Sequence, residues 1–112
     1  MVNQLTLDAT FAALSDPIRR GVLQRLADHP ASVSSLAEDY DISLPGMLKH
    51  VRVLERAHLV ETRKQGRTRH CLLKTEPFSE ASRWLEQTRR TWESRFDSLA
   101  VYLKTIQEEP RP

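Results

Sequence analysis

Residues 43–73, SLPGMLKHVRVLERAHLVETRKQGRTRHCLL, decide the fold that we expect for this chain. In the first half of the stretch, apolar residues recur three and four positions apart, as in a helix with one buried side. Ser43 is a favourable N-cap for this helix, and Pro45 is tolerated because it lies in the first turn. We therefore predict a helix over residues 43–57. Its buried side carries Met47, Val51 and Leu54.

The second half of the stretch has the pattern of a β-hairpin. Strand-forming residues flank Gln65-Gly66, and Gly66 readily supplies the positive φ that a tight hairpin turn requires. The hairpin is predicted over residues 60–73. Because it follows the helix directly and is basic, we interpret it as a wing. The basic residues around its tip are Arg63, Lys64, Arg67 and Arg69.

Two further helices are predicted near the N-terminus. Apolar residues indicate the first of them over residues 5–14. Asp16 is a good N-cap and Pro17 is favoured at a first helical position, so a second helix begins at Pro17 and runs to about residue 27. A residue before proline is pushed out of the helical conformation, and His29-Pro30 therefore ends this helix.

A third helix, predicted over residues 33–40 with Ser32 as its N-cap, lies just before the helix of residues 43–57. The tight turn between these two helices includes Asp41, and Asp adopts the left-handed backbone conformation more readily than most residues. Two helices joined by such a turn form a helix-turn-helix, whose second helix enters the major groove of DNA. We therefore predict that residues 43–57 are a recognition helix.

The last segment, residues 78–108, has apolar residues three, four or seven positions apart, which predicts one long amphipathic helix. About thirty helical residues span roughly 45 Å, more than the core of so small a chain can cover. The apolar stripe from Phe78 to Ile106 therefore needs a partner. The predicted architecture is mainly α with a β wing, a winged helix-turn-helix in the order α-α-α-α-β-β-α.

The bulk properties of the chain limit its class. Its 112 residues are expected to form a single domain over residues 1–112. No apolar run approaches the roughly 20 residues that span a bilayer, so we expect no membrane contact. The N-terminus lacks the pattern of a secretory signal, and the single Cys71 cannot form an internal disulfide. Both features favour the cytoplasm.

Positive charge is concentrated in the middle of the chain. Residues 43–70 contain seven lysines and arginines and two acidic residues, whereas the net charge of the whole chain is +2. A stretch of this kind suits a polyanion, because each phosphate that is neutralised releases condensed counterions. Charge alone does not distinguish this interpretation from a solvated basic surface. The helix-turn-helix pattern favours double-stranded DNA as the partner.

Four segments together resemble the ArsR/SmtB family of winged-helix repressors: FAALSDPIRRGVLQRLA, SVSSLAEDYDIS, PGMLKHVRVLERAHLVETRKQGRTRHCLL and WLEQTRRTWESRFDSLAVYL. The resemblance extends from Phe11 to Leu103, and its most specific part is SLPGMLKHVRVL followed by Leu-Val-Glu. It implies a homodimer built from the helices of residues 5–14 and 78–108, a palindromic operator, and a signal that the sequence does not identify. The predicted interface residues are Leu7, Phe11, Leu85, Trp92, Phe96, Leu99 and Leu103.

The predicted DNA-binding surface combines the outward side of the recognition helix with the wing. Pro45, Leu48, Lys49 and Arg52 are expected opposite the apolar side of the helix. The wing is expected on the minor groove or flanking phosphates. Family members usually carry polar residues in place of Leu44 and Leu48, which disfavours hydrogen bonding to bases here, whereas a leucine can contact a thymine methyl. The predicted residues are Ser43, Leu44, Pro45, Leu48, Lys49, Arg52, Arg63, Lys64, Arg67 and Arg69.

Other functions receive less support from the sequence. Its histidines and Cys71 are scattered, so we predict no metal site and no cofactor, and a metal- or redox-responsive repressor stays an alternative. His50 lies beside the apolar side of its helix and is interpreted as structural. No phosphate loop, nucleophile elbow or catalytic triad is recognisable, so we expect no enzyme. The other alternative is a winged-helix adaptor without DNA binding, which Leu44 and Leu48 favour.

Overall fold

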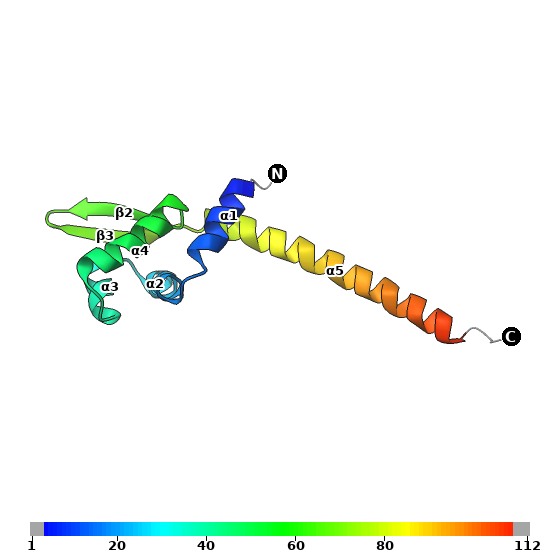
Figure 1. The fold of residues 1–112 in the computed structure, drawn as a ribbon. Coiled ribbons are helices and arrows are strands. Elements are labelled where there is room, and N and C mark those ends of the chain that lie inside the picture. Colours follow the sequence, from blue (N-terminus) through cyan, green and yellow to red (C-terminus); the bar gives the residue numbers. More distant parts are fainter. Residues whose placement is uncertain (1–3, 109–112) are drawn as a thin grey trace. The chain divides into compact units, whose positions relative to one another are not determined.

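The computed structural model describes residues 4–108. These residues form two compact units, of which the first ends at Ala81 and the second begins at Ser82. The strands and the first four helices lie in the first unit, and the last helix begins there and continues through the second (Figure 1). The elements are α1 (Gln4–Ala13), α2 (Pro17–Asp28), β1 (Ala31–Ser32), α3 (Val33–Asp39), α4 (Leu44–Arg56), β2 (Val60–Gln65), β3 (Thr68–Leu73) and α5 (Glu76–Glu108).

Three side chains start helices as the sequence predicts. The Asp16 carboxylate accepts a hydrogen bond from the Arg19 amide at 3.0 Å and so caps α2. The hydroxyls of Ser32 and Ser43 cap α3 and α4 in the same way, each accepting an amide hydrogen bond at 3.1 Å. Each bond satisfies an amide that the first turn of a helix leaves without a partner. These caps confirm the predicted helix starts and keep the turn between α3 and α4 short.

Helices α3 and α4 both end with a residue in the left-handed conformation. Asp41 has a φ of 52° and His58 has a φ of 60°. In each case an amide just beyond the helix bonds back to a carbonyl of the last turn, at 3.1 Å after α3 and at 3.0 Å after α4. This is the Schellman arrangement, which usually uses glycine. The prediction for Asp41 is confirmed, whereas the role of His58 was not predicted.

The sheet has three antiparallel strands in the order β1-β3-β2. The predicted hairpin is confirmed, with Gln65 opposite Thr68 next to the turn and Gly66 at a φ of 63°. The two-residue strand β1 was not predicted, because Ser32 has the signature of a helix cap and two residues carry no alternating pattern. Ser32 in fact does both, capping α3 and pairing with His70 of β3.

The core of the first unit lies between α2, α3, α4 and the sheet. The beginning of α5 contributes to it, because Phe78 packs against the core and Ala81 is buried. The helices therefore cover the apolar side of the small sheet, as a winged helix requires. The largest fully buried side chains are Leu36, Met47, Leu54, Leu59, Val22, Val51, Thr10 and Cys71.

Helix α5 differs from the other helices in its exposure. From Ser82 to Glu108 its apolar side chains remain on the surface, including Trp92 at 60% and Phe96 at 59% exposure. The helix is therefore amphipathic, as predicted, and its stripe is not covered by any of residues 4–108. No helix within residues 4–108 is long and apolar enough to cross a membrane.

Loss of the α2 cap tests how the first unit is held together. Asp16→Ala should lower the free energy of unfolding at neutral pH by about 1 kcal/mol, because one first-turn amide loses its partner. The pKa of Asp16 is lowered, first by the Arg19 amide and also by His50. Its contribution is therefore present above the unfolded pKa and lost as the pH falls through the lower folded pKa.

Urea unfolding of the wild type and of Asp16→Ala at several pH values measures this difference. The matched control is Asp28→Ala, an exposed carboxylate in the last turn of the same helix, where a negative charge is not favoured. A destabilisation of Asp16→Ala that is equal at neutral and at strongly acidic pH would contradict the role of the charged cap.

Candidate nucleic-acid interface

One side of α4 is buried and the other is open. Met47, Val51 and Leu54 are each 1% exposed or less, as predicted. Lys49 and Arg52 are exposed, and so are the first residues of the helix, including Leu44 at 46%. The helix therefore presents these two cations, the exposed Arg56 of its last turn and its N-terminal end to the solvent. The N-terminal end is the part of a recognition helix that contacts base edges.

Leu48 does not lie opposite the core as the helical pattern predicted. Its side chain is partly buried and packs against the core cluster, and it also lines a cavity of about 290 Å³ between α4 and the sheet. At this position the Leu48 side chain gains apolar contacts with the core, which a polar side chain would not. The prediction that Leu48 contacts DNA is separate from this placement and stays a prediction.

Two consecutive side-chain hydrogen bonds connect α4 to the wing formed by β2 and β3. The Thr62 hydroxyl of β2 donates to the Glu55 carboxylate of α4. The Arg69 guanidinium of β3 in turn donates to the Thr62 oxygen at 3.0 Å. Glu55, Thr62, Arg52 and Arg69 also line the 290 Å³ cavity. Two predicted DNA-binding arginines, one from each element, are thereby brought to the same site.

Sequence reasoning missed this connection. Glu55 and Thr62 belong to a helix and a strand, and seven residues with a turn between them give no periodic signal. The only trace in the sequence is a carboxylate in the last turns of the helix followed by a polar residue early in the strand. The connection matters because it limits rotation of the wing relative to α4.

The wing cations differ in how far they are already neutralised. Arg63 lies 3.4 Å from Glu61, whose other oxygen lies 3.8 Å from Lys74. Within residues 4–108, Lys64 and Arg67 take part in no ion pair, and the same holds for the exposed Lys49, Arg52 and Arg56 of α4. Exposed cations without a carboxylate partner can bind a phosphate without first giving up an ion pair.

His50 has a structural position. Its Nδ1 lies 3.7 Å from the carboxylate of Asp16, the residue that caps α2, and both side chains are partly buried. The contact connects α4 to the start of α2 on the side away from the exposed cations. This agrees with the interpretation of His50 as a residue that supports the helix-turn-helix.

Cys71 lies in the centre of the sheet and is fully buried. Burial raises the pKa of its thiol to about 11, and the nearby Glu55 carboxylate adds to this effect. The thiolate is the reactive form of cysteine, so this environment suppresses reactivity. Among the residues that the structure describes, no three His, Cys, Asp or Glu side chains lie close enough to hold a metal ion.

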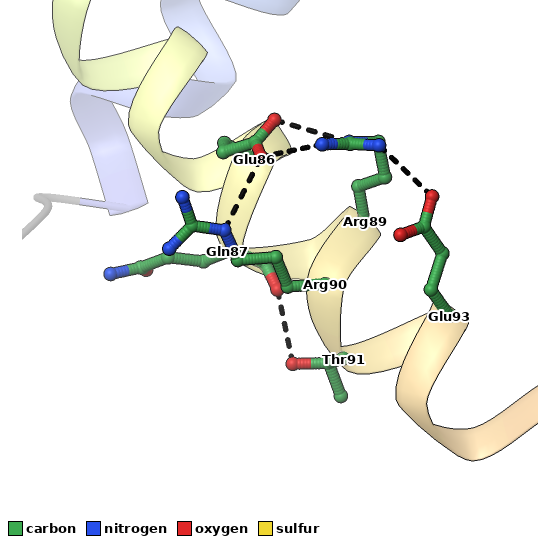
Figure 2. A network of polar contacts seen from close by, with 6 residues as sticks. All are labelled: Glu86, Gln87, Arg89, Arg90, Thr91 and Glu93. Carbon is green, nitrogen blue, oxygen red and sulfur yellow. Dashed lines mark hydrogen bonds and ion pairs between the residues drawn. The ribbon is translucent and has the colours of Figure 1, made fainter. Parts of the chain in front are cut away.

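The second unit carries one apolar stripe and one charged side. On the stripe, the Trp92 and Phe96 rings lie 5.9 Å apart between their centroids. Figure 2 shows the charged network, in which Arg89 contacts both Glu86 and Glu93, and Arg90 contacts Glu86. These bonds lower the pKa of Glu86 and raise that of Arg89. Pairs at this spacing support an exposed helix.

The residues predicted for the dimer interface differ in exposure. Leu7 of α1 is 3% exposed and is already covered inside the first unit, whereas Phe11 is exposed. The others lie on α5 and are exposed, and their spacing of three, four or seven places them along one side of the helix. They are Leu85, Trp92, Phe96, Leu99 and Leu103.

A helix-turn-helix with a basic wing defines a class of protein, the winged-helix DNA-binding regulators. A helix-turn-helix domain family matches residues 14–63 of this chain. A crystal structure of an ArsR family transcriptional regulator aligns with a TM-score of 0.78 and 43% identity, covering 84% of this chain and 98% of that one. The chain therefore belongs to the ArsR family of transcriptional regulators, which are not enzymes.

Two curated relatives support this assignment. The HTH-type transcriptional regulator Rv2034 of Mycobacterium tuberculosis is 40% identical over 62 residues, which are 55% of this chain and 58% of that protein. The transcriptional repressor SdpR of Bacillus subtilis is 27% identical over 79 residues, covering 70% of this chain and 88% of SdpR. The aligned part thus spans little more than half of Rv2034 but most of SdpR.

The environment of Cys71 predicts slow chemistry at its thiol. At pH 8 a pKa near 11 instead of 9.0 makes the thiolate about a hundredfold scarcer. Native protein should therefore react with a thiol-specific disulfide reagent at least about a hundredfold more slowly than protein unfolded in urea. Absorbance of the released thiol measures both rates. Equal rates in the two states would show that the thiol is accessible and would revive the redox alternative.

Proposed function

We propose that this chain is a repressor that binds a palindromic operator in duplex DNA as a homodimer. In this proposal α4 lies in the major groove, and the wing formed by β2 and β3 lies on the flanking backbone or in the minor groove. DNA binding of this kind is expected in the cytoplasm. The observation that carries the proposal is the cavity shared by Arg52 of α4 and Arg69 of β3.

The arrangement of charge supports DNA as the ligand. Lys49 and Arg52 on α4, and Lys64 and Arg67 near the hairpin turn, are exposed and have no carboxylate within ion-pair distance in the described residues. An acidic peptide or a small anion would contact few of these cations, whereas a DNA duplex offers phosphates along both of its backbones. The name of the relative SdpR supports repression as the outcome of binding.

The exposed stripe of α5 supports a second copy of the chain as partner. Leu85, Trp92, Phe96, Leu99 and Leu103 are each about half exposed or more and lie along one side of the helix. A contiguous exposed apolar patch of this kind marks a site of protein–protein contact. A two-fold partner would cover this stripe with the same stripe, since self-complementary contacts are the rule in symmetric dimers. A dimer would also duplicate the recognition helix, as a palindromic operator requires.

Removing one wing cation tests the DNA surface. Arg67→Ala should weaken binding to the duplex upstream of the chain's own gene, and should lower the slope of log affinity against log salt by about one for each subunit. Fluorescence anisotropy at several salt concentrations measures both quantities. Arg90→Ala is the matched control, because this arginine lies on α5 and pairs with Glu86. An unchanged slope for Arg67→Ala would remove the wing from the interface.

A charge placed on the stripe tests the dimer. Wild-type protein at micromolar concentration should have about twice the chain mass of 12.9 kDa in light scattering. Phe96→Asp should shift this mass to that of the monomer, because two carboxylates would be buried against apolar side chains. Val101→Asp is the control, since Val101 is 67% exposed and lies on the other side of α5. A monomeric wild type would contradict the proposal.

A further inference from the structure

The leading turn of α4 has no side chain that can donate a hydrogen bond to a base. Its first three residues are Leu44, Pro45 and Gly46. In the preceding residue, the Ser43 hydroxyl oxygen accepts a hydrogen bond from the Gly46 amide at 3.1 Å and retains its own proton as a donor. The end of the helix that enters a groove first therefore differs from the polar surface that reads base edges by hydrogen bonding.

The backbone of this turn offers few donors as well. Pro45 has no amide hydrogen, and the Gly46 amide is bonded to the Ser43 side chain. The Met47 amide donates to the Ser43 carbonyl at 2.9 Å. Hydrogen bonding from the leading turn is therefore largely satisfied within the helix itself.

What this turn presents instead is apolar surface from two exposed side chains, Leu44 and Pro45, of which Leu44 is the larger. Leu44 is 46% exposed, whereas Leu48, one turn further along, is partly buried against the core. Leu44 also borders a shallow depression that Glu38 and Asp41 line. These carboxylates repel phosphates, so the surroundings of Leu44 favour the floor of a groove over its charged walls.

We propose that Leu44 reads thymine through the 5-methyl group, the one apolar group that the major groove presents. This rests on the proposed function, since it requires α4 to lie in the major groove. The nearby Lys49 and Arg52 supply affinity through phosphates, and Leu44 supplies discrimination between thymine and the other bases. It is thus a specificity-determining residue that acts by apolar contact.

The test removes the methyl group and nothing else. A duplex is first selected by the wild-type protein from a randomised pool. Each thymine is then replaced in turn, at symmetric positions, by deoxyuridine, which pairs identically but lacks the methyl. At one position in each half-site, wild-type affinity should fall about fourfold for each methyl removed, the value of one buried methyl or methylene group.

Two variants assign the effect to its residue. Leu44→Ala should bind the thymine and deoxyuridine duplexes equally at that position, and thermal unfolding checks that this exposed substitution leaves the fold intact. Lys49→Ala is the matched control, because Lys49 is also exposed and lies five residues further along α4. It should bind more weakly with a smaller salt slope but keep the wild-type ratio between thymine and deoxyuridine.

The possible results separate the two proposals. If wild-type protein binds every deoxyuridine duplex as well as the parent, with steep salt dependence, the role of Leu44 is overturned and DNA binding stands. The same holds if Leu44→Ala keeps the wild-type ratio. If no duplex is bound at low salt, both proposals are overturned, and the protein behaves as an adaptor.

Discussion

Met47, Val51 and Leu54 are almost completely removed from water, and their burial determines how α4 is rotated about its axis. Each such side chain contributes roughly 1.5–3 kcal/mol relative to exposure, so a rotation by one residue would cost most of the stability of a small domain. Everything on the other side of the helix depends on this constraint. The exposed cations of α4 and its open N-terminal end keep a constant orientation because the apolar side cannot move.

The wing is held to this helix by polar contacts and not by apolar packing alone. Thr62 donates to Glu55 on one side and accepts from Arg69 on the other, so a single hydroxyl connects α4, β2 and β3. Beneath it, the fully buried Cys71 lies on the central strand, where it pairs with both neighbouring strands. The wing is therefore an extension of the core, and its basic turn has a defined base from which to reach DNA.

Much of this fold could be predicted because its signals are local. Asp16, Ser32 and Ser43 are caps that act within three residues, and the positive φ of Gly66 belongs to a single turn. The features that were missed depend on partners far along the chain or on conformations unusual for their residue type. Strand β1 exists only because β3 pairs with it, His58 takes a place that glycine usually fills, and Leu48 is covered by elements that a helical wheel does not include. At the candidate site, residue identities were predictable, but the link between Glu55 and Thr62 was not.

The leading turn Leu44-Pro45-Gly46 has a consequence for how such a regulator would evolve. A protein that recognises bases by hydrogen bonding leaves buried donors or acceptors unsatisfied at a wrong base, which is costly in binding free energy. A protein that recognises bases by apolar contact loses only contact area at a wrong base. Binding to a mismatched operator would then be weakened only mildly, in proportion to the apolar contact that the wrong base fails to make. Such a protein tolerates sequence changes in its target sites. A single polar substitution in the leading turn of α4 would change which operators it binds, and so which genes it controls.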